Sequence, residues 1–250
     1  MSIRKLQALA VVACLFAAPA SWAALTSYSQ DFEGLNQADP GALGADGWLV
    51  GANVFDSTGT TFLYNYFSFP APNGGAGFSG IDIGQGGPNQ GAQQMVVYND
   101  YNNADHNVGN RIQANVFQEQ VIGAGDLGFT SIFSFDAKQG NIGGDTTALA
   151  FLKVIDVVGG SFAVLGEVTV DTTALGANWV EDITLSLAID GGWEGQLLQF
   201  GFQNTASNFD DSGVFYDNIN VAAVPVPAAV WLFGSGLGLL GWMRRRAQQS

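Results

Sequence analysis

The chain has 250 residues, of which 47% are hydrophobic, and its formal net charge is −14. This length suits one domain of moderate size, or two small ones, once targeting segments are set aside. The acidic excess disfavours binding to nucleic acid or to anionic membranes, and the single cysteine, Cys14, excludes a disulfide framework.

Residues 1–23 have the three parts of a secretory signal peptide in the required order. A basic start at Arg4 and Lys5 is followed by an apolar run to Ala18, and small residues precede a cleavage after Ala23. A transmembrane anchor is the alternative, but the apolar run is shorter than the ~20 residues that span a bilayer. The pattern therefore predicts export with cleavage.

Cys14 lies inside this apolar run. The sequence VVAC that ends there can also be read as a lipoprotein box, which would leave a lipid-anchored product. Little hydrophobic sequence precedes Cys14 and an equally apolar run follows it, so cleavage after Ala23 is favoured. The exported chain then has no thiol for catalysis or for metal binding.

Alternation of apolar and polar residues, typical of half-buried β-strands, recurs through the middle of the chain. In LQFGFQ, for example, Leu198, Phe200 and Phe202 share one face and Gln199 and Gln203 the other. The other strands expected from such patterns and from the turns between them span 28–32, 48–55, 62–69, 95–98, 112–116, 129–135, 148–157, 162–170, 183–189 and 214–221.

About eleven strands without a sustained helical pattern must each bury one face, and two packed sheets achieve this. We therefore expect residues 24–223 to form a single all-β domain, a jelly-roll β-sandwich. The segment 78–110 is rich in Gly, Asn and Gln, and we expect long loops there around one short strand. No fixed repeat is present, which disfavours a solenoid.

Near the C-terminus, sixteen uncharged residues, 228–243, are followed by Arg244, Arg245 and Arg246. A helix of this length spans about 24 Å, slightly less than the hydrocarbon core, and thinning of the bilayer accommodates the difference. The arginines remain cytoplasmic by the positive-inside rule, which leaves the domain on the far side of the membrane. A buried core helix is the alternative, but such helices do not normally end in an arginine triplet.

The C-terminal segment 224–250 resembles the PEP-CTERM sorting signal of exported Gram-negative proteins. The resemblance rests on Val224, Pro225, Val226 and Pro227, then AAVWLFGSGL, then the three arginines. It implies recognition by a membrane exosortase after signal peptidase has acted, transient anchoring in the inner membrane, and release to the cell surface or the extracellular matrix. The family's central glutamate is Val226 here, which leaves the position of cleavage open.

No catalytic motif is visible, so we expect a protein that is not an enzyme. The exported segment has one histidine, His106, which a Ser–His–Asp triad would have to use with Asp105. A single histidine in a loop rich in amides is more often solvated.

Asp100, Asn102 and Asp105 faintly resemble a calcium loop, but Arg111 stands where a bidentate glutamate is needed. No clustered pair of carboxylates suggests glycoside hydrolysis.

The phrases SQDFEGL near the start of the domain, FSFDAK in its middle and GVFYDNINV at its end resemble jelly-roll carbohydrate-binding modules. In that family an acidic residue after the first strand and an aspartate in the last strand commonly ligate structural calcium. Glu33 and Asp217 match these positions, with Asn218 and Asp31 as further contributors. Calcium takes six to eight oxygens, so such a site would tie the chain ends together. The alternative is that these residues are surface acids at strand ends.

The same resemblance implies a sugar site in which aromatic rings stack on the sugar and polar side chains bond its hydroxyls. The candidates are Trp193, Tyr98, Tyr101, Tyr64, Gln199 and Gln203. Trp193, between glycines and Glu194, is the one expected to be exposed, and core packing is the alternative for each aromatic residue. The expected function is a non-catalytic module that binds extracellular polysaccharide.

Three other functions remain open at the level of the sequence. A structural protein of the biofilm matrix would act through charge and calcium without a sugar site. An ice-binding protein would need a flat, regular threonine array, whereas the threonine pairs here are scattered, at 60–61, 146–147 and 172–173. A polysaccharide-active enzyme would release reducing ends from matrix polymers.

Overall fold

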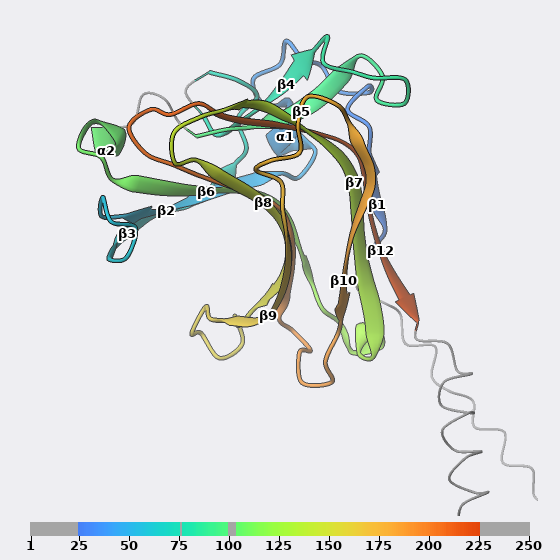
Figure 1. Cartoon of the computed structure of the whole chain (residues 1–250). Coiled ribbons are helices and arrows are strands. Elements are labelled where there is room, and N and C mark those ends of the chain that lie inside the picture. The colour runs from blue at the N-terminus through green and yellow to red at the C-terminus, as the bar shows by residue number, and fades with distance from the viewer. Residues whose placement is uncertain (1–24, 76, 100–103, 226–250) are drawn as a thin grey trace, which may run out of the picture.

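The computed structural model of the protein describes residues 25–75, 77–99 and 104–225. Their backbone forms two antiparallel six-stranded sheets that pack face to face (Figure 1), so the predicted all-β sandwich is confirmed. No helix among the described residues is long and apolar enough to cross a membrane. Several predicted features lie outside the described residues: the signal peptide 1–23, Tyr101, Pro227, the apolar segment 228–243, Arg244, Arg245 and Arg246.

Sheet A contains both chain ends of the domain, with the order β10-β7-β12-β5-β4 and β1 paired to β12. Its strands are β1 (Tyr28–Gln30), β4 (Ser79–Ile83), β5 (Gln93–Val97), β7 (Phe129–Ile142), β10 (Val180–Ala188) and β12 (Ser212–Pro225). Gln30 of β1 lies opposite Ile219 of β12, so the first and last strands are neighbours. Val224 and Pro225, which the sequence assigns to the sorting signal, pair with β7 at Thr130 and Phe129.

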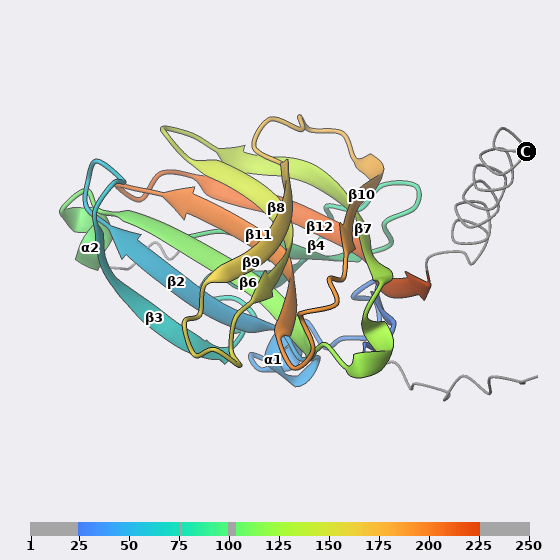
Figure 2. The same cartoon turned by 90° about the horizontal axis from the view of Figure 1, so that it is seen from below.

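Sheet B has the order β3-β2-β6-β11-β8-β9. Its strands are β2 (Leu49–Phe55), β3 (Phe62–Pro70), β6 (Arg111–Val121), β8 (Thr147–Ile155), β9 (Val164–Asp171) and β11 (Leu197–Ala206). The last three strands in the chain, β10, β11 and β12, alternate between the two sheets. The strands of sheet B bend, so the face of this sheet that points away from sheet A is concave (Figure 1), and Figure 2 shows them side by side in front of sheet A. We call this surface the free face of sheet B.

The described residues contain twelve strands, and the expectation of a single strand within 78–110 is wrong. Both β4 and β5 lie there. Ser79, Gly80 and Ile81 in β4 are all buried, so the strand lacks the alternation by which a half-buried strand is recognised. Three single turns of helix also occur, which are too short to show a helical period: α1 (Ala42–Ala45), α2 (Ala104–Asn107) and a 3₁₀ turn (Ala124–Asp126).

Aromatic rings from both sheets fill the centre of the core. Phe202 of sheet B stacks on Tyr216 of sheet A, with ring centroids 3.6 Å apart. Phe135 meets Phe202 edge-on at 5.1 Å, and Trp48 stacks against the other side of this group at 6.2 Å from Phe202. All four rings are buried. The phenylalanine alternation in β7 and β11 therefore decides which face of each sheet points inward.

Candidate functional site

The free face of sheet B has an apolar floor made by two phenylalanines. Gly201 in β11 lies opposite Phe117 of β6 on one side and Phe151 of β8 on the other. Since Phe200 and Phe202 point into the core, Gly201 and its two partners point away from it. Both of the flanking rings are nevertheless buried, which requires other side chains to cover them.

Polar side chains surround this floor on the same face. Gln199 lies opposite Glu119 and Lys153, and Gln203 lies opposite Asn115. The Gln199 amide donates a hydrogen bond from Nε2 to Oε2 of Glu119, 3.0 Å away. The two predicted glutamines therefore lie on the same face of one strand, four residues apart with Gly201 between them, as the alternation in LQFGFQ predicts.

Lys153 covers the floor and is itself largely withdrawn from solvent. Its Nζ lies 3.9 Å from the centroid of the Phe151 ring, which places a cation against the aromatic face. Burial lowers the pKa of the Lys153 ammonium, while the Glu167 carboxylate acts in the opposite direction. The sequence offered no signal for this arrangement because it depends on the pairing of β8 with β9 and β11.

Phe162 stands at the rim of the same surface and is 71% exposed. Together with Lys153 and Gln199 it lines a cavity of about 390 Å³. The expectation of a strand over 162–170 is wrong at its start, since β9 begins at Val164 and Phe162 belongs to the preceding turn, with φ of 53°. An aromatic residue placed just after the VVGGS turn was the signal that could have identified it.

Trp193 is half-buried and packs against the core, whereas we expected it to be exposed. Its ring lies over the backbone of β9 at Gly166, where an added methyl group would come within 2.5 Å of the indole. The glycines around Trp193 thus allow the turn to fold back and bring the ring inward, and they do not leave it in solvent.

The two described tyrosine candidates lie elsewhere. Tyr64 is opposite Val54, whose side chain is buried, so the tyrosine points to the inner side of edge strand β3, and its hydroxyl donates to the carboxylate of Asp105. Tyr98 follows β5 in sheet A, and its hydroxyl donates to the carbonyl oxygen of Gly75 at 3.1 Å. Neither tyrosine joins the glutamines on the free face of sheet B.

The four residues expected to ligate calcium lie in one region, where β1 meets β12. Asp31 and Asn218 line a cavity of about 300 Å³ between these strands. The Oε1 atom of Glu33 accepts hydrogen bonds from two backbone N–H groups at the start of β5, at 2.6 and 2.7 Å. Glu33 thus ties the N-terminal segment to β5, whatever else it binds.

Asp217 is fully buried, and its Oδ1 accepts the backbone N–H of Asn218 at 2.6 Å while its Oδ2 has no hydrogen-bond partner within the described structure. Burial is the main cause that raises the pKa of this carboxyl to about 7, and the charges of Asp136, Asp31 and Glu33 add to it. Among the described residues, no three His, Cys, Asp or Glu side chains form a group that would hold a metal ion. Calcium therefore stays a prediction.

His106 is buried in α2, and the expectation that it is solvated is wrong. Its ring stacks on Phe209, with centroids 5.0 Å apart, and its Nδ1 accepts the backbone N–H of Phe209 at 3.2 Å. The ring therefore packs α2 against the loop before β12. Sequence reasoning missed this because the contact joins residues about a hundred positions apart.

No protein-family model matches the chain, and no curated protein matches it. Among solved structures, the chain is similar to the enzymatically active domain of tailspike protein 4 of bacteriophage CBA120, with 14% identity, 76% of this chain covered and a TM-score of 0.43. It spans 22% of that chain's length.

Other similar structures include a carbohydrate-binding module and a cyclase. The CBM22-1 xylan-binding domain from Paenibacillus barcinonensis Xyn10C has 14% identity, with 84% of this chain and 99% of that chain covered and a TM-score of 0.40. A cyclase from Fischerella sp. TAU has 15% identity, with 82% and 99% covered and a TM-score of 0.45. At this level the similarity concerns the fold and not the activity.

Proposed function

We propose that this chain is an exported, non-catalytic protein that binds an extracellular polysaccharide on the free face of sheet B. The observation that carries the proposal is the set of amides from Asn115, Gln199 and Gln203 on a concave surface, with the exposed ring of Phe162 at its rim. Amides both donate and accept hydrogen bonds, as sugar hydroxyls do, and an exposed aromatic ring suits the C–H faces of sugar rings.

The charge of the exported segment supports a neutral polymer as the ligand. It contains all 22 acidic residues of the chain against three basic ones, a formal charge of −19. Such a surface repels nucleic acid and acidic polymers at low salt. We infer that the partner is a polysaccharide without a high density of carboxylates or sulfates.

We infer the route of export from the two chain ends. Signal peptidase removes residues 1–23, and an exosortase processes the PEP-CTERM-like signal 224–250 while the segment 228–243 crosses the inner membrane. The jelly-roll domain is then located at the cell surface or in the extracellular matrix.

We also propose that calcium binds where the chain ends meet. The buried Oδ2 of Asp217 has no donor within the described structure, and a divalent cation would compensate this charge and the nearby carboxylate of Asp31. Glu33 and Asn218 offer further oxygens in the same region. The role of the ion would be structural, since it would join the first and last strands.

Replacing Gln199 and Gln203 together with alanine is expected to weaken polysaccharide binding about 5- to 150-fold. Each lost hydrogen bond to a ligand contributes about 0.5–1.5 kcal/mol, so two of them correspond to about this factor. Affinity electrophoresis through gels that contain neutral xylan, β-glucan or mannan measures the effect.

The matched control is Gln37→Ala, which makes the same change at an exposed loop position. Its retardation in the gel should equal that of the unchanged protein. If the double variant is retarded as strongly as the control in every gel that retards the unchanged protein, the free face of sheet B is not the binding surface.

A further inference from the structure

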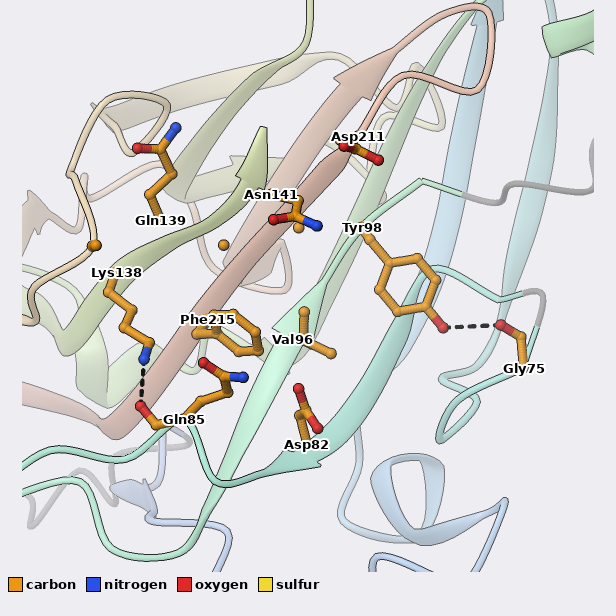
Figure 3. A pocket seen from close by; sticks show the side chains of 13 residues that line it. Gly75, Asp82, Gln85, Val96, Tyr98, Lys138, Gln139, Asn141, Asp211 and Phe215 are labelled. Atoms are coloured by element: carbon orange, nitrogen blue, oxygen red, sulfur yellow. Dashed lines mark hydrogen bonds between the residues drawn. The ribbon is translucent and has the colours of Figure 1, made fainter. Parts of the chain in front are cut away.

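A second groove lies on the outer face of sheet A, on the opposite side of the sandwich from the free face of sheet B. Its volume is about 960 Å³. Phe215 of β12 and Val96 of β5 form its floor, and polar side chains stand around them (Figure 3): Asp82, Gln85, Tyr98, Lys138, Asn141 and Asp211. We call this the sheet A groove.

Two glycines in central strands create this groove. Gly140 of β7 and Gly213 of β12 are neighbours, since an added methyl group at Gly140 would lie 2.7 Å from the carbonyl oxygen of Gly213. The methyl group added at Gly140 would also lie 2.9 Å from Cε2 of Phe215, so the phenylalanine ring lies over Gly140. Glycine in the interior of a strand is unfavourable unless another group approaches closely, and here it leaves room beside an aromatic ring.

The cation of the groove is held in place by its neighbours. Lys138 lies directly opposite Phe215, and its Nζ donates to the carbonyl oxygen of Gln85. The ammonium also lies 5.4 Å from the ring centroid of Phe215 and 5.3 Å from that of Trp179. Burial lowers the pKa of Lys138, and Asp82 opposes this shift. The amine is thus a fixed donor at one side of the ring.

Two further polar side chains, Asn141 and Asp211, face solvent across the groove without a hydrogen bond to any described residue. They provide one amide and one carboxylate beside a partly exposed ring. This combination supplies donors and acceptors in several directions next to an apolar surface, which is the pattern of a site for a polyhydroxylated ring.

The geometry points to a second saccharide site in the sheet A groove, with a neutral sugar ring over Phe215. Asp82 and Asp211 contribute two negative charges against the single charge of Lys138, so an anionic sugar is disfavoured here. Hydroxyl groups of the sugar would accept from Lys138 and donate to Asp211, and the amide of Asn141 would bond others.

Because the groove and the free face of sheet B lie on opposite sides of one domain, a protein with both sites would bridge two polysaccharide chains. This consequence rests on the proposed function, whereas the groove itself does not. Bridging would also unite the two roles that the sequence left open, a sugar-binding module and a structural component of the matrix.

The test compares Gly213→Leu with Gly191→Leu in the full-length chain, kept in a detergent without a sugar headgroup. At Gly213 an added methyl group has no neighbour closer than 3.8 Å, so leucine fills the groove without a clash. At Gly191 nothing lies within 4 Å, and this loop position is outside the groove. Phe215→Ala is a second variant, which removes the ring without filling the groove.

Isothermal titration calorimetry with hexasaccharides of xylose, glucose and mannose, and with an oligogalacturonate, measures the number of sites. We expect two molecules of a neutral hexasaccharide per chain for the unchanged protein and for Gly191→Leu. Gly213→Leu should bind one, and the Gln199→Ala, Gln203→Ala variant should bind one with unchanged affinity and the other about 5- to 150-fold more weakly. Phe215→Ala should weaken the second site at least tenfold.

The outcomes separate the two sites. If the unchanged protein binds one molecule, and Gly213→Leu leaves its affinity unchanged while the double glutamine variant weakens it, the groove is no saccharide site and the proposed function stands. If Gly213→Leu alone abolishes binding, the groove is confirmed and the free face of sheet B is excluded. If the oligogalacturonate binds and Gly213→Leu removes that binding, the inference that the ligand of the groove is neutral is wrong. If no probe binds, both proposed saccharide sites are wrong.

Discussion

Replacing Phe202 with alanine is expected to lower the free energy of unfolding by about 3–5 kcal/mol, the range for truncation of a buried phenylalanine. Phe202 is fully buried, stacks on Tyr216 at 3.6 Å and contacts Phe135 at 5.1 Å. Truncation would therefore remove ring contacts between the two sheets and leave a cavity. Domains have about 5–15 kcal/mol of stability in total, so the loss is a large part of it. Urea unfolding followed by tryptophan fluorescence measures it.

Phe162→Ala is the matched control because it makes the same change at a ring that is 71% exposed. We expect its free energy of unfolding to stay within about 0.5 kcal/mol of that of the unchanged protein. Equal losses in the two variants would contradict the inter-sheet aromatic core. Phe162→Ala also removes the ring at the rim of the free face of sheet B, so a loss of polysaccharide binding without a loss of stability would support the proposed site.

The core could be predicted because alternation is a local property of the sequence. Phe200 and Phe202 face inward, and Gln199 and Gln203 face outward, simply because successive side chains of a strand point to opposite faces. The same rule fails for β4, where residues on both faces are buried. Covering loops cause this burial, and a pattern within five residues cannot show which loop will cover them.

The candidate sites were harder to predict because they depend on the register between strands. The floor of the free face of sheet B exists because Gly201 pairs with Phe117 and Phe151, and the sheet A groove exists because Gly140 and Gly213 are neighbours. These residues are far apart in the chain. In the sequence, each glycine taken alone predicts only a turn or a β-bulge. Register is set by the whole sheet, so no single segment reveals it.

The aromatic candidates failed for a related reason. Turn glycines around Trp193 suggested an exposed loop, yet the turn folds back over Gly166 and buries part of the ring. An aromatic residue near glycines therefore predicts a close approach of the backbone, and not the direction in which the ring points. Phe162, which follows a similar turn, is the exposed one.

Calcium is expected to raise the melting temperature by about 5–10 °C at a concentration one hundred times its dissociation constant. Binding to the native state alone contributes about 2.7 kcal/mol at that ratio, and each kcal/mol corresponds to about 2–4 °C for a domain of this size. Thermal unfolding followed by circular dichroism, in a chelator and then with calcium or magnesium, measures the shift. Magnesium should give a smaller one, because it needs a tighter octahedral site.

Asp217→Asn should abolish the calcium shift and should not lower the melting temperature in the chelator. The native carboxylate is fully buried, and one of its oxygens has no partner within the described structure, so removing its charge removes a cost of burial. Glu194→Gln, the same loss of charge at an exposed position, should keep the full shift. If calcium raises the melting temperature of Asp217→Asn as much as that of the unchanged protein, the ion binds elsewhere. The region where β1 meets β12 is then stabilised by hydrogen bonds such as those that Glu33 accepts.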